Sequence, residues 1–265
     1  MLIRLYLEVL RGAKIIEITV SLALLLCGAV FLAGVSKGGF GSGVAFISTP
    51  ILALALEPAQ ALGIMLPLLM LADLVSLKLY WKRWDLNNSK VLIIGGAGGV
   101  IIAIWFYQFV SSDILRMLIG GVSLSFVSFQ MFRHLGIVKF RRQGLKKGVG
   151  LMVGLLAGFT SFVSHAGGPP VAMFLLSQGV NKTVYQATTV ISFFVINIFK
   201  VVPYAFLGLF TLDTLKINLL MAPVMVLGTL AGALAHRIIP ERLYFGFSYL
   251  LLVITGIKLF WDALT

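Results

Sequence analysis

Long apolar runs separated by short polar connectors occupy almost the whole chain, and this pattern limits what it can fold into. Hydrophobic residues make up 60% of the 265 residues and charged residues only 11%, against about 45–50% and about 25% in a soluble domain. A helix crosses a bilayer core with about 20 apolar residues, so the chain can supply about eight spans. We therefore expect an all-α polytopic membrane protein with no room for a soluble domain.

Most of the apolar segments are long enough to cross a bilayer as helices. The segments cover residues 15–35, 44–56, 60–80, 91–110, 114–135, 148–164, 171–178, 183–207, 214–236 and 242–262. The second and the seventh are short, and each begins after a Gly-rich break. We expect 8–10 membrane segments, including short or re-entrant helices after these breaks.

The order of long and short segments occurs twice, which predicts an internal duplication. Residues repeat with the order, because Leu32-Ala33-Gly34 aligns with Leu156-Ala157-Gly158 at an interval of 124 residues. The same interval places Asp73 opposite Asn197. We expect two homologous helical repeats: 1–135 with an N-terminal interfacial helix, and 148–265, joined by a basic cytoplasmic connector at 136–147.

The fourth and ninth segments each carry a GxxxG pattern, as Gly95 with Gly99 and Gly228 with Gly232. Small residues at this spacing allow two helices to approach closely in lipid. We therefore expect these segments to approach neighbouring helices closely.

Basic residues fall mainly in the connectors between apolar runs. The 21 Lys and Arg against 9 Asp and Glu give a net charge of +12, and their clustering in short loops is typical of a cytoplasmic face rather than of a nucleic-acid-binding surface. The distribution mildly favours four crossings in each half, and so parallel halves. The unequal charge of the equivalent connectors 78–90 and 211–216 favours inverted halves instead. We lean to the parallel arrangement.

Two Gly-rich breaks occupy matched positions, SKGGFGSG at 36–43 and SHAGGPP at 164–170. Backbone groups freed by a broken helix in hydrocarbon need partners, so such breaks persist where they line a cavity. A helix that starts there points its positive end at the cavity, which suits an anion. Tight connectors or helix-packing patches are the alternative. The predicted substrate-binding residues are Ser36, Lys37, Gly39, Gly41, Ser42, Gly43, Ser164, His165, Gly167 and Gly168.

Three polar residues inside apolar segments, Asp73, Asn197 and Lys200, are predicted to form a polar core or a coupling site. Ionisable residues at membrane depth are costly and indicate a pathway or a proton site. Each has a simpler interpretation as well. Asp73 and Lys37 would neutralise each other as a buried ion pair, Lys200 would extend to the interface, and His165 would be structural.

No enzyme site assembles from the sequence. The three His lie in different segments without metal-ligand spacing, the single Cys excludes an internal disulfide, and no nucleotide motif is present. We expect neither a metal nor another cofactor. A membrane-embedded enzyme and a non-transporting subunit of a membrane complex are the alternatives to a transporter.

The duplicated motifs, Leu32-Ala33-Gly34 followed by the first break and Leu156-Ala157-Gly158 followed by the second, resemble the sulfite exporter TauE/SafE family of membrane permeases. The likeness covers nearly the whole chain. It implies a secondary transporter of a small anion such as sulfite or an organosulfonate, multi-pass in the inner membrane of a bacterial cell. It is compatible with a homodimer. The family's usual glycine triplet is interrupted here by Ser42 and shortened to Gly167-Gly168.

Overall fold

The computed structural model describes residues 19–40, 45–136, 146–235 and 241–265. Every regular element within these ranges is helical, so the predicted all-α class is confirmed. The expected interfacial helix and most of the basic connector lie outside the described residues. Gly41, Ser42 and Gly43 of the first break lie outside them too.

The helices match the expected alternation of long and short segments. In order they are α2 (Val20–Val35), the π-helical turn η1 (Ser36–Phe40), the 3-10 turn η2 (Ala45–Ile47), α3 (Ser48–Ala53), α4 (Pro58–Leu79), α5 (Leu86–Tyr107), α6 (Ser112–His134), α7 (Lys147–Ser164), α8 (Gly168–Ser177), α9 (Lys182–Phe206), α10 (Leu212–Ala235) and α11 (Glu241–Asp262). Seven helices in the described ranges are long and apolar enough to cross a membrane. The two segments expected to be short are α3, with 6 residues, and α8, with 10.

Local capping residues set where several helices begin. The Asp85 side chain accepts a hydrogen bond from the Asn88 backbone at the start of α5, and Asn181 accepts from Val184 at the start of α9. At α4, Glu57 and Gln60 form a capping box. Each contact satisfies a backbone amide that lacks a helical partner.

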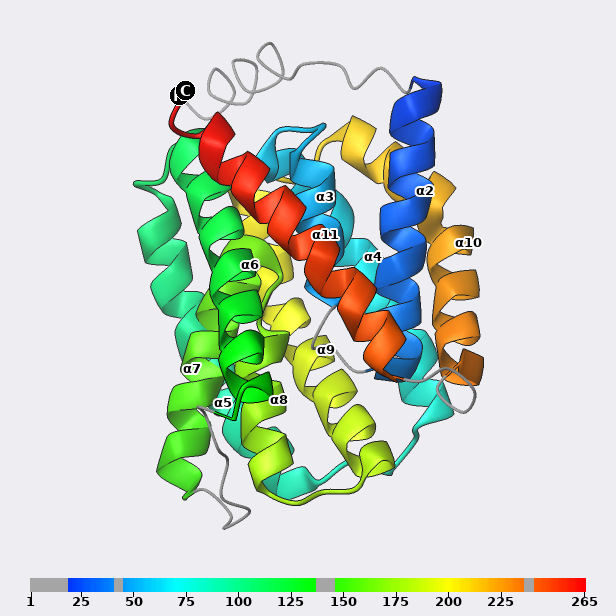
Figure 1. Cartoon of the computed structure of the whole chain (residues 1–265), viewed down its shortest axis with the longest axis vertical. Coiled ribbons are helices and arrows are strands. Elements are labelled where there is room, and N and C mark those ends of the chain that lie inside the picture. The colour runs from blue at the N-terminus through cyan, green and yellow to red at the C-terminus, as the bar shows by residue number, and fades with distance from the viewer. Residues whose placement is uncertain (1–18, 41–44, 137–145, 236–240) are drawn as a thin grey trace.

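The two halves run in opposite directions. Figure 1 shows α2 descending and α7 ascending through the view, while short α3 reverses the chain between α2 and α4. Contacts agree, because Lys37 at the end of α2 meets Ser76 near the end of α4. His165 at the end of α7 meets Leu62 near the start of α4. The leaning to parallel halves is therefore wrong, and the inverted arrangement that the unequal charge of the connectors 78–90 and 211–216 favoured is the one observed.

The GxxxG segments make very close helix contacts. A Cβ atom at Gly99 would lie 2.0 Å from the Leu155 carbonyl oxygen of α7. One at Gly232 would lie 2.1 Å from the Val35 carbonyl oxygen of α2. Each half thus packs its GxxxG helix against the first helix of the other half, as the spacing predicted for tight packing.

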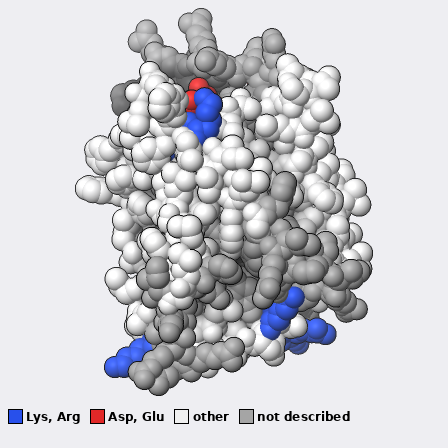
Figure 2. Space-filling model, in the orientation of Figure 1, with Lys and Arg blue, Asp and Glu red and all other residues white. Residues whose placement is uncertain are grey.

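Helices α4 and α9 pack against each other inside the bundle, and the sides of the molecule are apolar. Exposed large apolar side chains include Phe206 at 88% and Leu219 at 79%. Figure 2 shows one face on which the Lys, Arg, Asp and Glu side chains of the described residues lie mainly toward the two ends of the molecule. Such a surface is the one a lipid-facing helical bundle presents.

Candidate functional site

The first break places a lysine in the protein interior. Lys37 lies on the π-helical turn that continues α2 and is 3% exposed. Its Nζ donates to Asp73 Oδ1 of α4 at 2.6 Å and lies 5.4 Å from the centre of the Phe193 ring of α9. Single π turns within helices occur often at functional sites. The buried ion pair that the sequence offered as an alternative role for Lys37 and Asp73 is therefore present.

Side chains from both halves satisfy the carbonyl groups of this turn. The Lys37 carbonyl oxygen accepts from Gln186 Nε2 at 2.6 Å and from Ser76 Oγ at 3.3 Å. The Tyr80 hydroxyl donates to the Gly38 carbonyl oxygen at 2.8 Å. A π turn inside a membrane protein needs such partners, so these three side chains hold the lysine in position.

A second lysine lies behind the second break. Lys200 of α9 is fully buried, so the alternative interpretation that it extends to the interface is wrong. Its Nζ donates to the Ser161 carbonyl oxygen at 2.9 Å, to Asn197 Oδ1 at 3.1 Å and to His165 Nδ1 at 2.9 Å. Ser161 Oγ lies 3.2 Å away as a further acceptor.

One hydrogen-bonded chain connects the two lysines. Asn197 Nδ2 donates to Asp73 Oδ2 at 3.1 Å, while Asn197 Oδ1 accepts from Lys200. At the far end, His165 Nε2 lies 3.2 Å from the Leu62 carbonyl oxygen. The network runs from Lys37 through Asp73, Asn197 and Lys200 to His165, across both halves of the chain.

The network assigns the protons of its members. A carbonyl oxygen only accepts, so His165 Nε2 carries the proton and Nδ1 accepts from Lys200. The ring is therefore neutral. Lys200 then faces three groups that only accept, at Ser161, Asn197 and His165. An ammonium has three N–H donors and a neutral amine has two, so with a neutral His165 ring these contacts favour the ammonium form of Lys200.

The second break is built differently from the first. Helix α7 ends at His165, whose φ of 56° and ψ of 12° are left-handed, a region that histidine enters more readily than most non-glycine residues. Helix α8 starts at Gly168 and continues with two prolines, Pro169 and Pro170. Proline lacks an amide N–H, so the first turn of α8 offers fewer donors to an anion than the sequence argument assumed.

A small cavity of about 10 Å³ lies between the two breaks. Its lining residues come from both halves: Lys37, Leu69, Ser161, His165, Gly168, Phe193 and Asn197. A volume of this size holds about one water molecule. The bundle is therefore closed around the polar cluster in this conformation.

The predicted site residues divide into two groups. Lys37, His165, Gly168 and Asn197 line the cavity, and Asp73 and Lys200 lie directly behind it through their hydrogen bonds. The cavity lining found by the structure does not include Ser36, Gly39, Ser164 and Gly167.

Packing explains the place of these other residues. A Cβ at Gly39 would lie 2.0 Å from the Gly232 carbonyl oxygen, and one at Gly167 would lie 2.5 Å from that of Ala157. The Ser164 hydroxyl donates to the Thr160 carbonyl oxygen of its own helix at 2.8 Å. These contacts agree with the helix-packing interpretation of part of each break.

Three cavity residues, Leu69, Ser161 and Phe193, were not predicted. The interval of 124 residues places Ser161 opposite Lys37 and therefore contained a signal for it. Leu69 and Phe193 are apolar residues in apolar helices, and no local pattern distinguishes them from residues that face lipid.

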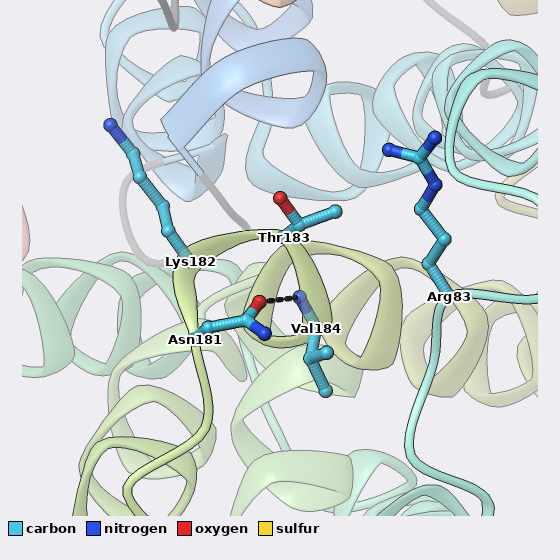
Figure 3. A pocket seen from close by; sticks show the side chains of 5 residues that line it. All are labelled: Arg83, Asn181, Lys182, Thr183 and Val184. Carbon is cyan, nitrogen blue, oxygen red and sulfur yellow. Dashed lines mark hydrogen bonds between the residues drawn. The ribbon is translucent and has the colours of Figure 1, made fainter.

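A larger hollow of about 570 Å³ lies at the end of the molecule where α9 begins. It is lined by Arg83 and residues 181–184, and Figure 3 shows the Lys182 and Arg83 side chains extending on either side of Thr183. Asn181 is occupied there in capping α9. This hollow is a basic surface depression, whereas the small cavity contains the buried charges, so the small cavity is the candidate site.

Comparison with known proteins gives one match. The model of the family described as sulfite exporter TauE/SafE matches residues 26–259. No curated protein and no solved structure matches.

Proposed function

This chain belongs to the sulfite exporter TauE/SafE family, whose members are membrane transporters and not enzymes, and we propose that it is a permease for a small anion. Sulfite and short organosulfonates are the proposed substrates. The proposed binding site is the small cavity between the two breaks, with Lys37, Ser161, His165 and Gly168 in its wall.

An excess of positive charge next to a closed cavity is the observation that carries this proposal. Lys37 is paired with Asp73, but Lys200 has only neutral partners among the described residues. An uncompensated charge inside a protein is costly. A bound anion would offset that cost, so the cluster favours an anion over a cation or a neutral substrate.

Matching contacts support an inverted duplication around this site. The Tyr80 hydroxyl bonds to the carbonyl oxygen 42 residues before it, at Gly38, and the Tyr204 hydroxyl bonds to the one 42 residues before it, at Phe162. The two tyrosines differ by 124 positions, the interval between Asp73 and Asn197. Secondary transporters built from inverted repeats place the substrate at the repeat interface.

The closed cavity suits one stage of alternating access. In this mechanism the halves move against each other around a fixed site, which opens to one side of the membrane at a time. The wall of the cavity is shared between α2 with its π turn, α4, α7, α8 and α9. A movement between the halves would therefore enlarge the cavity and expose Lys37.

The basic connectors support a particular orientation in the membrane, which we propose to be the inner membrane of a bacterium. Arg83, Lys147 and Lys182 lie where α5, α7 and α9 begin, at the lower end in Figure 1. The C-terminus lies at the opposite end. By the positive-inside rule the lower end is cytoplasmic. A reporter fused to the C-terminus should then be active outside the cytoplasm, and cytoplasmic activity would contradict this orientation.

Transport in proteoliposomes tests the proposed function. Vesicles containing the purified protein are expected to take up labelled sulfite, sulfoacetate or thiosulfate above the level of protein-free vesicles. The double variant Lys37→Met with Asp73→Asn removes both charges of the ion pair together and should reduce uptake, because the Lys37 N–H groups that face the cavity are lost. The control is Lys78→Met, an exposed lysine on α4. Absence of uptake for all three anions by the folded wild type would favour a non-transporting subunit.

A further inference from the structure

The buried charges can be counted. Among the described residues, the buried ionisable side chains of Lys, Arg, Asp, Glu or His are Lys37, Asp73, His165 and Lys200. His165 is neutral because Nε2 donates to a carbonyl oxygen and Nδ1 accepts from Lys200. The protonation states of Lys37, Asp73 and Lys200 determine the net charge that a substrate encounters in the cavity.

Asp73 is ionised and Lys37 is its partner. Both carboxylate oxygens of Asp73 face donors, Lys37 Nζ on Oδ1 and Asn197 Nδ2 on Oδ2, so neither oxygen needs a proton. Lys200 is an ammonium because it serves three obligatory acceptors. Two lysine charges and one carboxylate charge leave a net charge of +1 in the cluster.

The donors that remain for a ligand also follow from the network. Within the described residues, Lys37 Nζ has one hydrogen-bond acceptor, Asp73, which leaves two of its three N–H groups for the cavity that it lines. Ser161 Oγ, 3.2 Å from Lys200 Nζ, shares a Lys200 N–H with the other acceptors, and within the described residues its own O–H has no acceptor, so this O–H is able to donate into the same cavity. These three donors equal in number the oxygens of a sulfite or sulfonate group.

The rest of the wall is partly apolar. Leu69 and the Phe193 ring line the cavity together with these polar groups. A fourth charged oxygen placed against them would lose its hydration without gaining a hydrogen bond, which is costly. The sulfur lone pair of sulfite or the carbon substituent of a sulfonate meets no such penalty.

We infer that the site takes a singly charged pyramidal oxyanion, such as hydrogen sulfite or an alkyl sulfonate, and rejects divalent anions such as sulfate. This inference rests on the proposed transport function. One negative charge neutralises the cluster of +1, whereas a second would be buried without a partner in a medium of low dielectric constant. The charge number of the substrate is therefore selected by Lys200, the lysine without a carboxylate.

Uptake by the wild type tests the selection. Proteoliposomes are supplied with labelled methanesulfonate, which is monovalent, or with labelled sulfate, which is divalent and of similar size. Methanesulfonate uptake should exceed sulfate uptake by about tenfold or more, the ratio that a binding difference of about 1.4 kcal/mol gives. Sulfite uptake should be faster in mildly acidic than in mildly alkaline buffer, because sulfite gains a proton near neutral pH. Methanesulfonate keeps its charge and controls for effects of pH on the protein.

A charge variant tests the role of the cluster. Asp73→Asn raises the net charge from +1 to +2 and should shift the ratio of sulfate to methanesulfonate uptake upward by about tenfold. The matched control Asp113→Asn, an exposed carboxylate, should leave the ratio unchanged. If Asp73→Asn is not recovered folded, the wild-type ratio and the pH dependence of sulfite uptake decide the question.

The outcomes separate this inference from the function on which it rests. Uptake of sulfate equal to or faster than methanesulfonate would overturn the charge selection while leaving anion transport intact. An unchanged ratio in folded Asp73→Asn would overturn it as well. Absence of uptake for every anion would reject the proposed function, and the charge selection with it.

Discussion

At each end of the polar cluster a side chain donates a hydrogen bond to a backbone carbonyl oxygen, but the residue types differ between the two ends. In the first half, a serine on α4, Ser76, donates to the carbonyl oxygen of Lys37 in the break. In the second half, Lys200 on α9 donates to the carbonyl oxygen of Ser161. Both contacts span 39 residues, so lysine and serine have exchanged places between equivalent positions.

This exchange shows how two halves with similar contacts can differ in charge. The first half pairs its lysine with a carboxylate, Asp73, whereas the equivalent position of the second half is the amide Asn197. Each half keeps one buried lysine, but only one half keeps a counter-charge. The hydrogen bonds to the backbone carbonyl groups are therefore alike in the two halves, whereas the charges next to the cavity differ.

The largest expected effect comes from removing the unpaired charge. Lys200→Met should reduce anion uptake by about a hundredfold or more, since the cluster then has no excess charge to offset a bound anion. It should also destabilise the fold by about 1–3 kcal/mol for each acceptor left without a donor. Uptake in proteoliposomes and thermal unfolding in detergent measure the two effects, with Lys78→Met as control. Normal uptake by folded Lys200→Met would contradict the claim that the unpaired charge of the second half supports anion binding.

The next effect concerns the paired lysine. Asp73→Ala leaves Lys37 buried without its partner and should cost about 3–5 kcal/mol of stability, as breaking a buried ion pair does. The double variant Lys37→Met with Asp73→Asn should cost clearly less, because no charge is left alone. Denaturation in detergent compares the two. Equal losses would show that the pair does not act as a unit.

A smaller pair of effects sharpens the comparison. Tyr80→Phe and Tyr204→Phe each remove one hydrogen bond to a carbonyl oxygen of the helix end before the cavity. Each should cost about 1–3 kcal/mol, because a buried acceptor loses its donor. If the halves are equivalent, the two losses in unfolding free energy should agree closely. A loss confined to one tyrosine would argue against equivalent positions.

The smallest expected effect is that of a pH gradient on anion uptake. Both oxygens of Asp73 accept hydrogen bonds from fixed donors, Lys37 and Asn197, so the carboxylate has a structural place in the network. Methanesulfonate uptake should therefore be nearly unchanged by an imposed pH gradient, in the wild type and in Asp73→Asn alike. Uptake by vesicles with and without the gradient measures this. A gradient dependence that Asp73→Asn removes would instead assign proton coupling to Asp73.

Local signals were sufficient for the class of structure and for several residues of the buried polar cluster. Apolar length predicted the spanning helices, and the Gly-rich runs located the breaks between α2 and α3 and between α7 and α8. A charged residue inside an apolar segment is conspicuous, so Lys37, Asp73 and Lys200 were identified without a structure. The direction of the halves was missed because the distribution of Lys and Arg favoured the parallel arrangement only mildly, while the unequal charge of the connectors 78–90 and 211–216 favoured the inverted one.

The sequence by itself determined the membrane class, the order of the helices and the presence of buried polar residues, since each depends on residues that are neighbours in the chain. Only the tertiary structure decided which groups pair. The partner of Lys37 is 36 residues away and the glutamine that holds its carbonyl is 149 residues away. Such pairs meet because α4 and α9 pack against the π turn that follows α2. The unpaired charge of Lys200 results from this packing, because the same side chain opposite a carboxylate would have been neutralised.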